Sequence, residues 1–252
     1  MVGIFITARL GSTRLSQKHL LEVAGRTFIE WLVARLQTEF RQEIEAKKVG
    51  IFITTSVRPE NKQFNQIFKE TGVTVFPGSD DNIPLRHLQC ADHFGITHII
   101  SIDGDDILCS PHAARVVMNQ LKNNAEMVHT SGLPLGMNVL GYRTAFLKLC
   151  LEQQEPGKLE TGWGRIFPNE HIVDCPIPTV ADGAKLRMTL DYKDDADFFS
   201  AVIDKTAPNI LTMSDVDLID TILLNDLYKI NAGLNETYWK NFNEQKQAEQ
   251  NN

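Results

Sequence analysis

The chain has 252 residues, of which 42% are hydrophobic and 23% are charged, a composition typical of one large globular domain. Its formal net charge of −7 excludes a generally basic surface, so neither nucleic acid nor an anionic membrane is an expected partner. The chain has no run of about 18 apolar residues, no signal-like start and no paired cysteine motif, which predicts a cytoplasmic protein with reduced thiols.

The first apolar run, from Val2 to Ile6, predicts a short buried strand that ends in a polar loop. Glycine lets backbone amides approach an anion closely, arginine makes bidentate contacts with phosphate, and lysine acts as a compact point charge. The loop therefore predicts a cradle for a polyphosphate, and the alternative is a solvated basic loop after an edge strand. The cradle residues are Arg9, Gly11, Ser12, Arg14 and Lys18.

Strand-like and helix-like segments alternate after this loop. Thr27 and Glu30 predict a capping box that opens a helix, Pro59 starts another, and Asp80 is expected to cap a third. The alternation indicates an α/β fold, a three-layer sandwich with a mainly parallel central sheet whose ligands bind at the carboxyl ends of the strands. The expected strands cover residues 49–54, 73–76 and 98–102.

An acidic turn follows the strand that ends at Ile102. Asp103, Asp105 and Asp106 place three carboxylates within four positions, which is costly without a cation. Mg²⁺ is usually held by one or two carboxylates together with substrate phosphate. The turn therefore predicts a Mg²⁺ site, and the alternative is an acidic turn that caps the helix expected from Pro111.

The second half of the chain is less regular. Residues 127–130 predict a strand, and residues 186–191 alternate like a strand that ends in Asp191. Asp194 or Asp195 then caps the next helix. The main domain is expected to span residues 1–234, and the polar segment 235–252 is expected to be a frayed tail.

The cradle resembles the opening motif of the CMP-sugar synthetase group of nucleotidyltransferases. Its pattern is closest to the spore-coat-polysaccharide type of cytidylyltransferase, with the Kdo and acylneuraminate cytidylyltransferases further off. Ser16 and Ile107 stand where that family usually has proline. The matching residues are Ala8, Arg9, Gly11, Ser12, Arg14, Leu15 and Lys18, followed by the segments around Asp105 and Asp191.

The resemblance implies a glycosyltransferase-A-like nucleotidyltransferase fold and assigns roles to individual residues. Arg14, Lys18 and Asp105 would be catalytic, and Asp105 and Asp191 would hold Mg²⁺. The nucleotide would contact Ala8, Arg9, Gly11, Ser12 and Arg86, although Arg86 could equally be a surface arginine on a helix. The acceptor would contact Asn138, Tyr142, Arg165 and Arg187, although residues 160–165 could equally be a plain loop anchored by Trp163.

The predicted function is Mg²⁺-dependent transfer of CMP from CTP to a sugar, sugar acid or sugar-phosphate-like acceptor, with release of pyrophosphate. Its partners would be CTP, a small-molecule acceptor and, in a homodimer, a second copy of the chain. One alternative is a metal-dependent glycosyltransferase that uses Asp103-Gly104-Asp105 with a nucleotide-sugar donor. The other is a catalytically silent relative of the family.

Overall fold

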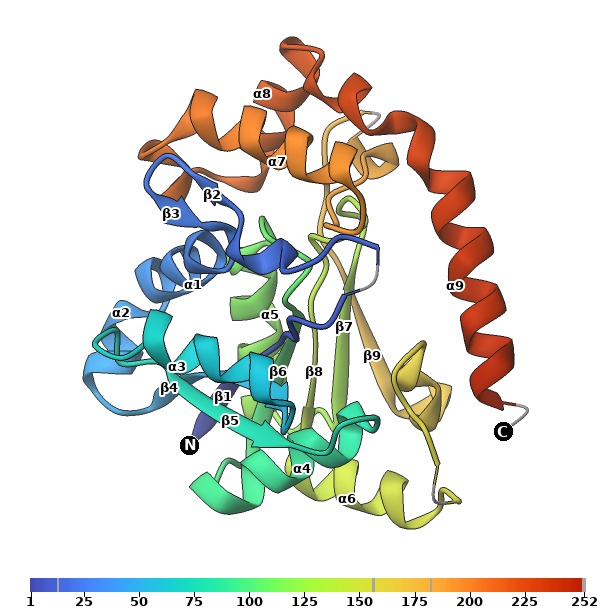
Figure 1. The fold of residues 1–252 in the computed structure, drawn as a ribbon. Helices are drawn as coiled ribbons and strands as arrows, with labels where there is room; N and C mark the ends of the chain where they lie inside the picture. Colours follow the sequence, from blue (N-terminus) through green and yellow to red (C-terminus); the bar gives the residue numbers. More distant parts are fainter. Residues whose placement is uncertain (13, 156, 182, 251–252) are drawn as a thin grey trace.

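The computed structural model describes residues 1–12, 14–155, 157–181 and 183–250 (Figure 1). Its centre is a seven-stranded sheet with the order β5-β4-β1-β6-β8-β7-β9. β5, β4, β1 and β6 run parallel, whereas β8 is antiparallel to both of its neighbours. The predicted α/β fold with a mainly parallel sheet is therefore confirmed. The strands of this sheet are β1 (Val2–Thr7), β4 (Val49–Ser56), β5 (Thr74–Gly78), β6 (His98–Asp103), β7 (Met127–Ser131), β8 (Leu140–Arg143) and β9 (Ile172–Pro176).

Helices cover both faces of the sheet (Figure 1). One face packs against α1 and α5, and the other packs against α4 and α6. A small hairpin of β2 (Glu22–Val23) and β3 (Arg26–Thr27) lies apart from the main sheet. The helices are α1 (Phe28–Glu39), α2 (Arg41–Glu45), α3 (Gln63–Ile67), α4 (Ile83–Phe94), α5 (Pro111–Lys122), α6 (Thr144–Glu152), α7 (Lys193–Thr206), α8 (Asp215–Leu224) and α9 (Asn235–Gln250).

β1 shows why the apolar runs become central strands. Ile4 and Ile6 belong to the core on the side of α1 and α5, whereas Phe5 belongs to the core on the side of α4 and α6. Successive side chains of a strand point to opposite faces, so a strand covered on both faces must be apolar throughout. This strand carries the cradle loop on its carboxyl end, between β4 and β6.

Several local predictions can be compared directly with these elements. The Thr27–Glu30 capping box at the start of α1 is confirmed. The cap predicted at Asp80 is wrong, because Asn82 caps α4 through its bond from the Leu85 N–H and Asp80 pairs with Arg58 instead. The predicted strand at residues 186–191 is also wrong, since only an isolated bridge forms there, between Leu135 and Arg187.

The C-terminal segment is ordered through residue 250 as helix α9, and not as the expected frayed tail; residues 251–252 lie outside the described part. Glu249 accepts hydrogen bonds from the Thr161 N–H at 2.9 Å and the Thr161 hydroxyl at 2.8 Å. Asn241 donates to the hydroxyl of Tyr192 at 2.8 Å. These contacts hold α9 against loops that come from two distant parts of the chain. Among the described residues, no helix is long and apolar enough to cross a membrane.

Candidate active site

The cradle loop lines a cavity of about 270 Å³ at the carboxyl ends of β1 and β6. The loop is anchored to the core, because the buried side chain of Asn61 accepts a hydrogen bond from the Leu10 N–H at 2.9 Å. The acidic turn docks closely against it, with the Gly104 N–H donating to the Thr7 carbonyl at 2.8 Å. A Cβ at Gly104 would come within 2.8 Å of the Cβ of Ala8, so only glycine allows this approach. All five predicted cradle residues line the cavity.

Lys18 contacts acidic groups from two separate segments of the site. Its ammonium nitrogen is 2.6 Å from Asp105 Oδ2, 2.6 Å from the Leu190 carbonyl and 3.6 Å from Asp191 Oδ1. The side chain is 5% exposed, so the charge depends on these partners rather than on water. Lys18 thus joins the acidic turn after β6 to the segment that precedes α7.

Asp105 is stabilised as a carboxylate by two neighbours. Burial disfavours its charge, but Lys18 and a 2.9 Å hydrogen bond with His19 outweigh this effect and hold the pKa of Asp105 far below its usual range. The carboxylate therefore carries its negative charge throughout the physiological pH range. His19 was not among the predicted site residues.

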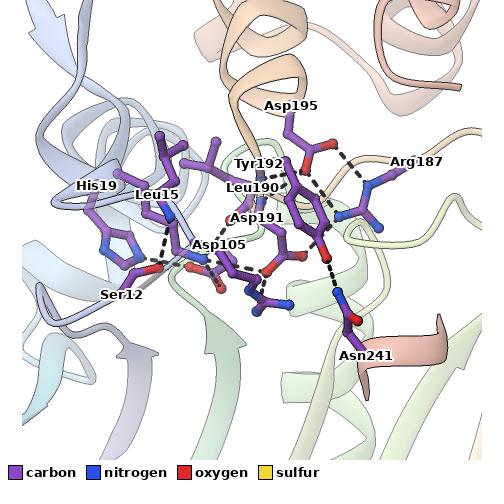
Figure 2. Close-up of polar contacts among 12 residues, drawn as sticks. Ser12, Leu15, His19, Asp105, Arg187, Leu190, Asp191, Tyr192, Asp195 and Asn241 are labelled. Atoms are coloured by element: carbon purple, nitrogen blue, oxygen red, sulfur yellow. Dashed lines mark hydrogen bonds and ion pairs between the residues drawn. The ribbon is translucent and has the colours of Figure 1, made fainter. Parts of the chain in front are cut away.

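Asp191 is held by two arginines. Arg14 donates to its Oδ1 at 2.7 Å. Arg187 donates to its Oδ2 at 2.9 Å (Figure 2). Arg187 also pairs with the fully buried Asp195, whose carboxylate accepts the N–H groups of Asp191 and Tyr192. Helix α7 begins at Lys193 with Tyr192 at the N-cap position, so Asp195 does not start it as predicted but caps it as the third residue of a capping box. Its carboxylate also anchors Arg187.

This geometry corrects the predicted acceptor contact by Arg187. Its side chain is 1% exposed and lies 4.4 Å from the ring centroid of Tyr238, beneath α9. Arg187 lines neither the cradle cavity nor the second cavity described below. Its buried guanidinium instead orients the carboxylate of Asp191. Its position in the fold therefore makes it a positioning residue.

A second cavity of about 270 Å³ lies beside the first, and Asp103 belongs to the lining of both. Asn138 lines this cavity, as predicted for an acceptor contact, and its amide donates to the Leu133 carbonyl at 2.9 Å. Burial and the nearby charge of Asp105 raise the pKa of Asp103 to about 6. The other residues that line the second cavity include Asp106, His129, Leu140, Trp163 and Phe242.

Tyr142 and Arg165 do not have the positions that an acceptor contact requires. Tyr142 is fully buried and its hydroxyl bonds to His87 at 2.6 Å, so that prediction is corrected: the ring belongs to the core beneath the site. Arg165 donates to the carbonyls of Thr161 and Gly162, and it does not line the second cavity.

Arg86 lines the cradle cavity but is not a surface arginine. It is 1% exposed, and its guanidinium donates to the carbonyls of Ser79 at 2.8 Å and Asp80 at 2.9 Å. Burial lowers the pKa of Arg86 to about 10, which leaves it charged at neutral pH. It therefore adds a fixed positive charge opposite the cradle.

Further lining residues were not among the predicted site residues. Glu160 forms an ion pair with Arg9, and Gln245 of α9 completes the lining of the cradle cavity. Phe242, one turn earlier on α9, lines the second cavity. Gln, Phe and Glu are common at structural positions, so their types alone do not mark a site.

The described residues contain no group of three or more His, Cys, Asp or Glu side chains arranged to hold a metal ion. Asp105 and Asp191 nevertheless direct one oxygen each to the same ammonium group, so two carboxylates converge on one centre of positive charge. Two carboxylates suit a divalent ion that takes its remaining ligands from phosphate oxygens and water. These two residues are the ones that could hold a metal.

The fold and the paired cavities define a nucleotidyltransferase-like protein, and comparisons with known proteins agree. A family model described as cytidylyltransferase matches residues 3–161, so the chain belongs to the cytidylyltransferase family. The resemblance noted from the sequence is thereby confirmed.

Three relatives illustrate the likeness. An uncharacterized protein of Methanocaldococcus jannaschii is 31% identical over 140 residues, 55% of this chain and 54% of that protein. The structure of a cytidylyltransferase from Leptospira borgpetersenii superposes with a TM-score of 0.77 at 24% identity, over 90% of this chain and 95% of that one. A CMP:2-keto-3-deoxy-manno-octonic acid synthetase complexed with CTP gives a TM-score of 0.61 at 14% identity, over 81% of this chain and 98% of that one.

The matches to the curated relatives cover only part of each protein. The chain spans about half the length of the curated relatives it matches. The likeness to the two solved structures confirms the nucleotidyltransferase fold expected from the resemblance.

Proposed function

We propose that the protein transfers CMP from CTP to a hydroxyl-bearing acceptor and releases pyrophosphate. The observation that carries this proposal is the convergence on Lys18 of two carboxylates from separate segments, Asp105 and Asp191, next to a glycine-containing cationic loop. The family supplies the expectation of cytidine, because the residues themselves call only for a nucleoside triphosphate.

The cradle would bind the triphosphate in the first cavity. Arg9, Arg14 and Arg86 line it together with Lys18, and Gly11 in the lining lets the loop backbone come close to phosphate oxygens. Arg14 and Lys18 would stabilise the charge that develops on the departing pyrophosphate. Each is already oriented by a carboxylate partner, so little reorganisation is needed in the transition state.

The acceptor would lie in the second cavity. Asp103 lines both cavities, so they share a wall. A nucleotide in the first cavity that places its α-phosphate at this wall would bring the phosphate close to an acceptor hydroxyl in the second cavity. Holding both reactants in such a geometry turns a bimolecular reaction into an effectively unimolecular one. The acceptor oxygen attacks phosphorus directly, and no protein nucleophile is required.

Mg²⁺ is the metal that this donor set would suit, with Asp105 and Asp191 as its protein ligands. When bound, it would neutralise phosphate charge and polarise the reacting phosphoryl group. Lys18 and the two arginines that hold Asp191 keep these carboxylates oriented toward the position of such an ion.

Calorimetric titration with CTP, ATP, GTP and UTP, each with and without Mg²⁺, tests the proposal. Selective binding of CTP that is weakened in Asp105→Asn supports it. Product analysis then separates the remaining alternatives, because pyrophosphate indicates nucleotidyl transfer and free nucleoside diphosphate indicates glycosyl transfer. Binding of no triphosphate would refute the proposal.

A further inference from the structure

The wall of the second cavity is acidic. Asp103 and Asp106 belong to its wall, and the described lining residues include no lysine or arginine. From this wall we infer that the acceptor is a molecule of monosaccharide size that bears hydroxyl groups and no negative charge, such as a neutral or amino sugar. The inference rests on the proposed function and narrows the acceptor class within it.

Three cationic side chains from segments around the cavity contact other groups. Arg165, the arginine expected to meet an acceptor carboxylate, donates to the carbonyls of Thr161 and Gly162. Arg187 pairs with Asp191 and Asp195 beneath α9. Lys246 lies with its aliphatic stem beside Gly162 at the rim, but it is not part of the lining. Within the described lining, a carboxylate or phosphate on the acceptor would therefore meet two acidic side chains and no lysine or arginine.

Asp103 and Asp106 belong to the same acidic turn and both line this cavity. Two acidic side chains close together disfavour an added anion, whereas an ammonium group on the acceptor would be attracted to them.

The rest of the lining suits a sugar ring. Trp163 and Phe242 supply aromatic surface, on which the apolar face of a ring can pack and beside which an ammonium group is also favoured. Trp163 is fixed by edge contacts with the rings of Tyr142 and Phe167. Asn138 and His129 add polar groups for hydroxyls. At about 270 Å³ the cavity lies just below the usual range for drug-sized ligands, about 300–1,000 Å³.

An acceptor without negative charge differs from the molecule named for one structural neighbour. One structural neighbour is named as acting with 2-keto-3-deoxy-manno-octonic acid, which carries a carboxylate. The wall described here offers such a group no protein cation. The difference therefore concerns the acceptor and leaves the nucleotide half of the reaction unchanged.

Matched acceptors test the inference. With CTP and Mg²⁺, pyrophosphate release would be measured for glucose, glucosamine, glucuronate and glucose 6-phosphate, and for the corresponding sets built on mannose and galactose. Within a set, the neutral or amino member should react at least about tenfold faster in kcat/KM than its anionic counterparts. If no sugar of a set reacts, the binding of its members to the CTP-loaded protein would be measured by saturation-transfer NMR. The neutral or amino sugar should then bind more tightly than its anionic counterparts.

A charge inserted into the wall gives an independent test. His129 is 46% exposed on β7, and its Nδ1 lies 3.4 Å from Asp174. His129→Lys should raise the ratio of anionic to neutral acceptor use or binding by about fivefold, as expected for an exposed ion pair. His129→Gln is the uncharged control, and Lys246→Met should leave the ratio unchanged because Lys246 lies outside the lining.

The outcomes separate the two proposals. CTP binding with preference for the carboxylated or phosphorylated members would leave the proposed function standing and overturn the acceptor class. Failure of every sugar both to react and to bind while CTP binds would overturn it as well. Absence of CTP binding would refute the proposed function itself.

Discussion

Lowering the pH should destabilise the protein through one histidine in its core. His87 is fully buried, with Nε2 2.8 Å from the Thr7 hydroxyl and Nδ1 2.6 Å from the Tyr142 hydroxyl. Burial, with a smaller contribution from the adjacent Arg86 charge, lowers the pKa of His87 to about 3. In the unfolded chain the same group has an ordinary pKa of about 6.5.

The sign follows from proton binding. Below pH 6.5 the unfolded chain binds a proton at His87 and the folded protein does not, so stability is full above this pH and falls as the pH drops toward 3. At pH 5 the loss is about 2 kcal/mol, which corresponds to a fall in Tm of about 4–8 °C for a chain of this size.

The assay is thermal unfolding of the wild type and of His87→Gln between pH 7.5 and 4.5. Glutamine can keep polar contacts with Thr7 and Tyr142 but does not titrate, so the difference between the two pH profiles isolates His87 and cancels the other titrating groups. His129→Gln, which removes an exposed histidine, should follow the wild-type profile. Parallel profiles for wild type and His87→Gln would refute the reasoning.

Three further outcomes are expected. Lys18→Met should lower kcat for pyrophosphate release by about 10²–10³-fold, because it removes a preorganised charge beside two carboxylates; a change under threefold would contradict this. Arg187→Met should lower the free energy of unfolding in urea by about 3–5 kcal/mol, since it leaves Asp191 and Asp195 buried without this partner; an unchanged midpoint would be inconsistent. A chain that ends at residue 234 should stay folded by circular dichroism but show raised KM values for both substrates, because α9 lines both cavities; unchanged KM values would contradict the role of the helix.

The parts of the site that could be predicted lie in short, contiguous motifs. Arg14 and Lys18 fall in one loop, and Asp105 follows directly after a buried strand, so residue type and order were sufficient to bring them together at one edge of the sheet. The same logic placed the capping box of Thr27, because both partners are three residues apart.

The acceptor side could not be predicted in the same way. Tyr142 and Arg187 match a family pattern, but the pattern does not show whether a side chain faces a cavity or is buried by another part of the chain. Tyr142 turns into the core and Arg187 is closed beneath α9. Strand β9 follows a stretch rich in glycine and proline and pairs in parallel with β7, a partner about 45 residues away. Such pairings are set by the assembled sheet and not by local periodicity.

Helix α9 shows most directly how a polar segment becomes part of a site. Its composition is that of a solvated tail, but Phe242 and Gln245 are three residues apart and therefore lie on one face of a helix. That face spans the two cavities, with Phe242 in the wall of the second and Gln245 in the wall of the first. Glu249 fixes the helix to the backbone at Thr161, in the loop that carries Trp163. One element thus contacts both substrate cavities and the loop between them, so the nucleotide and the acceptor are enclosed by the same helix.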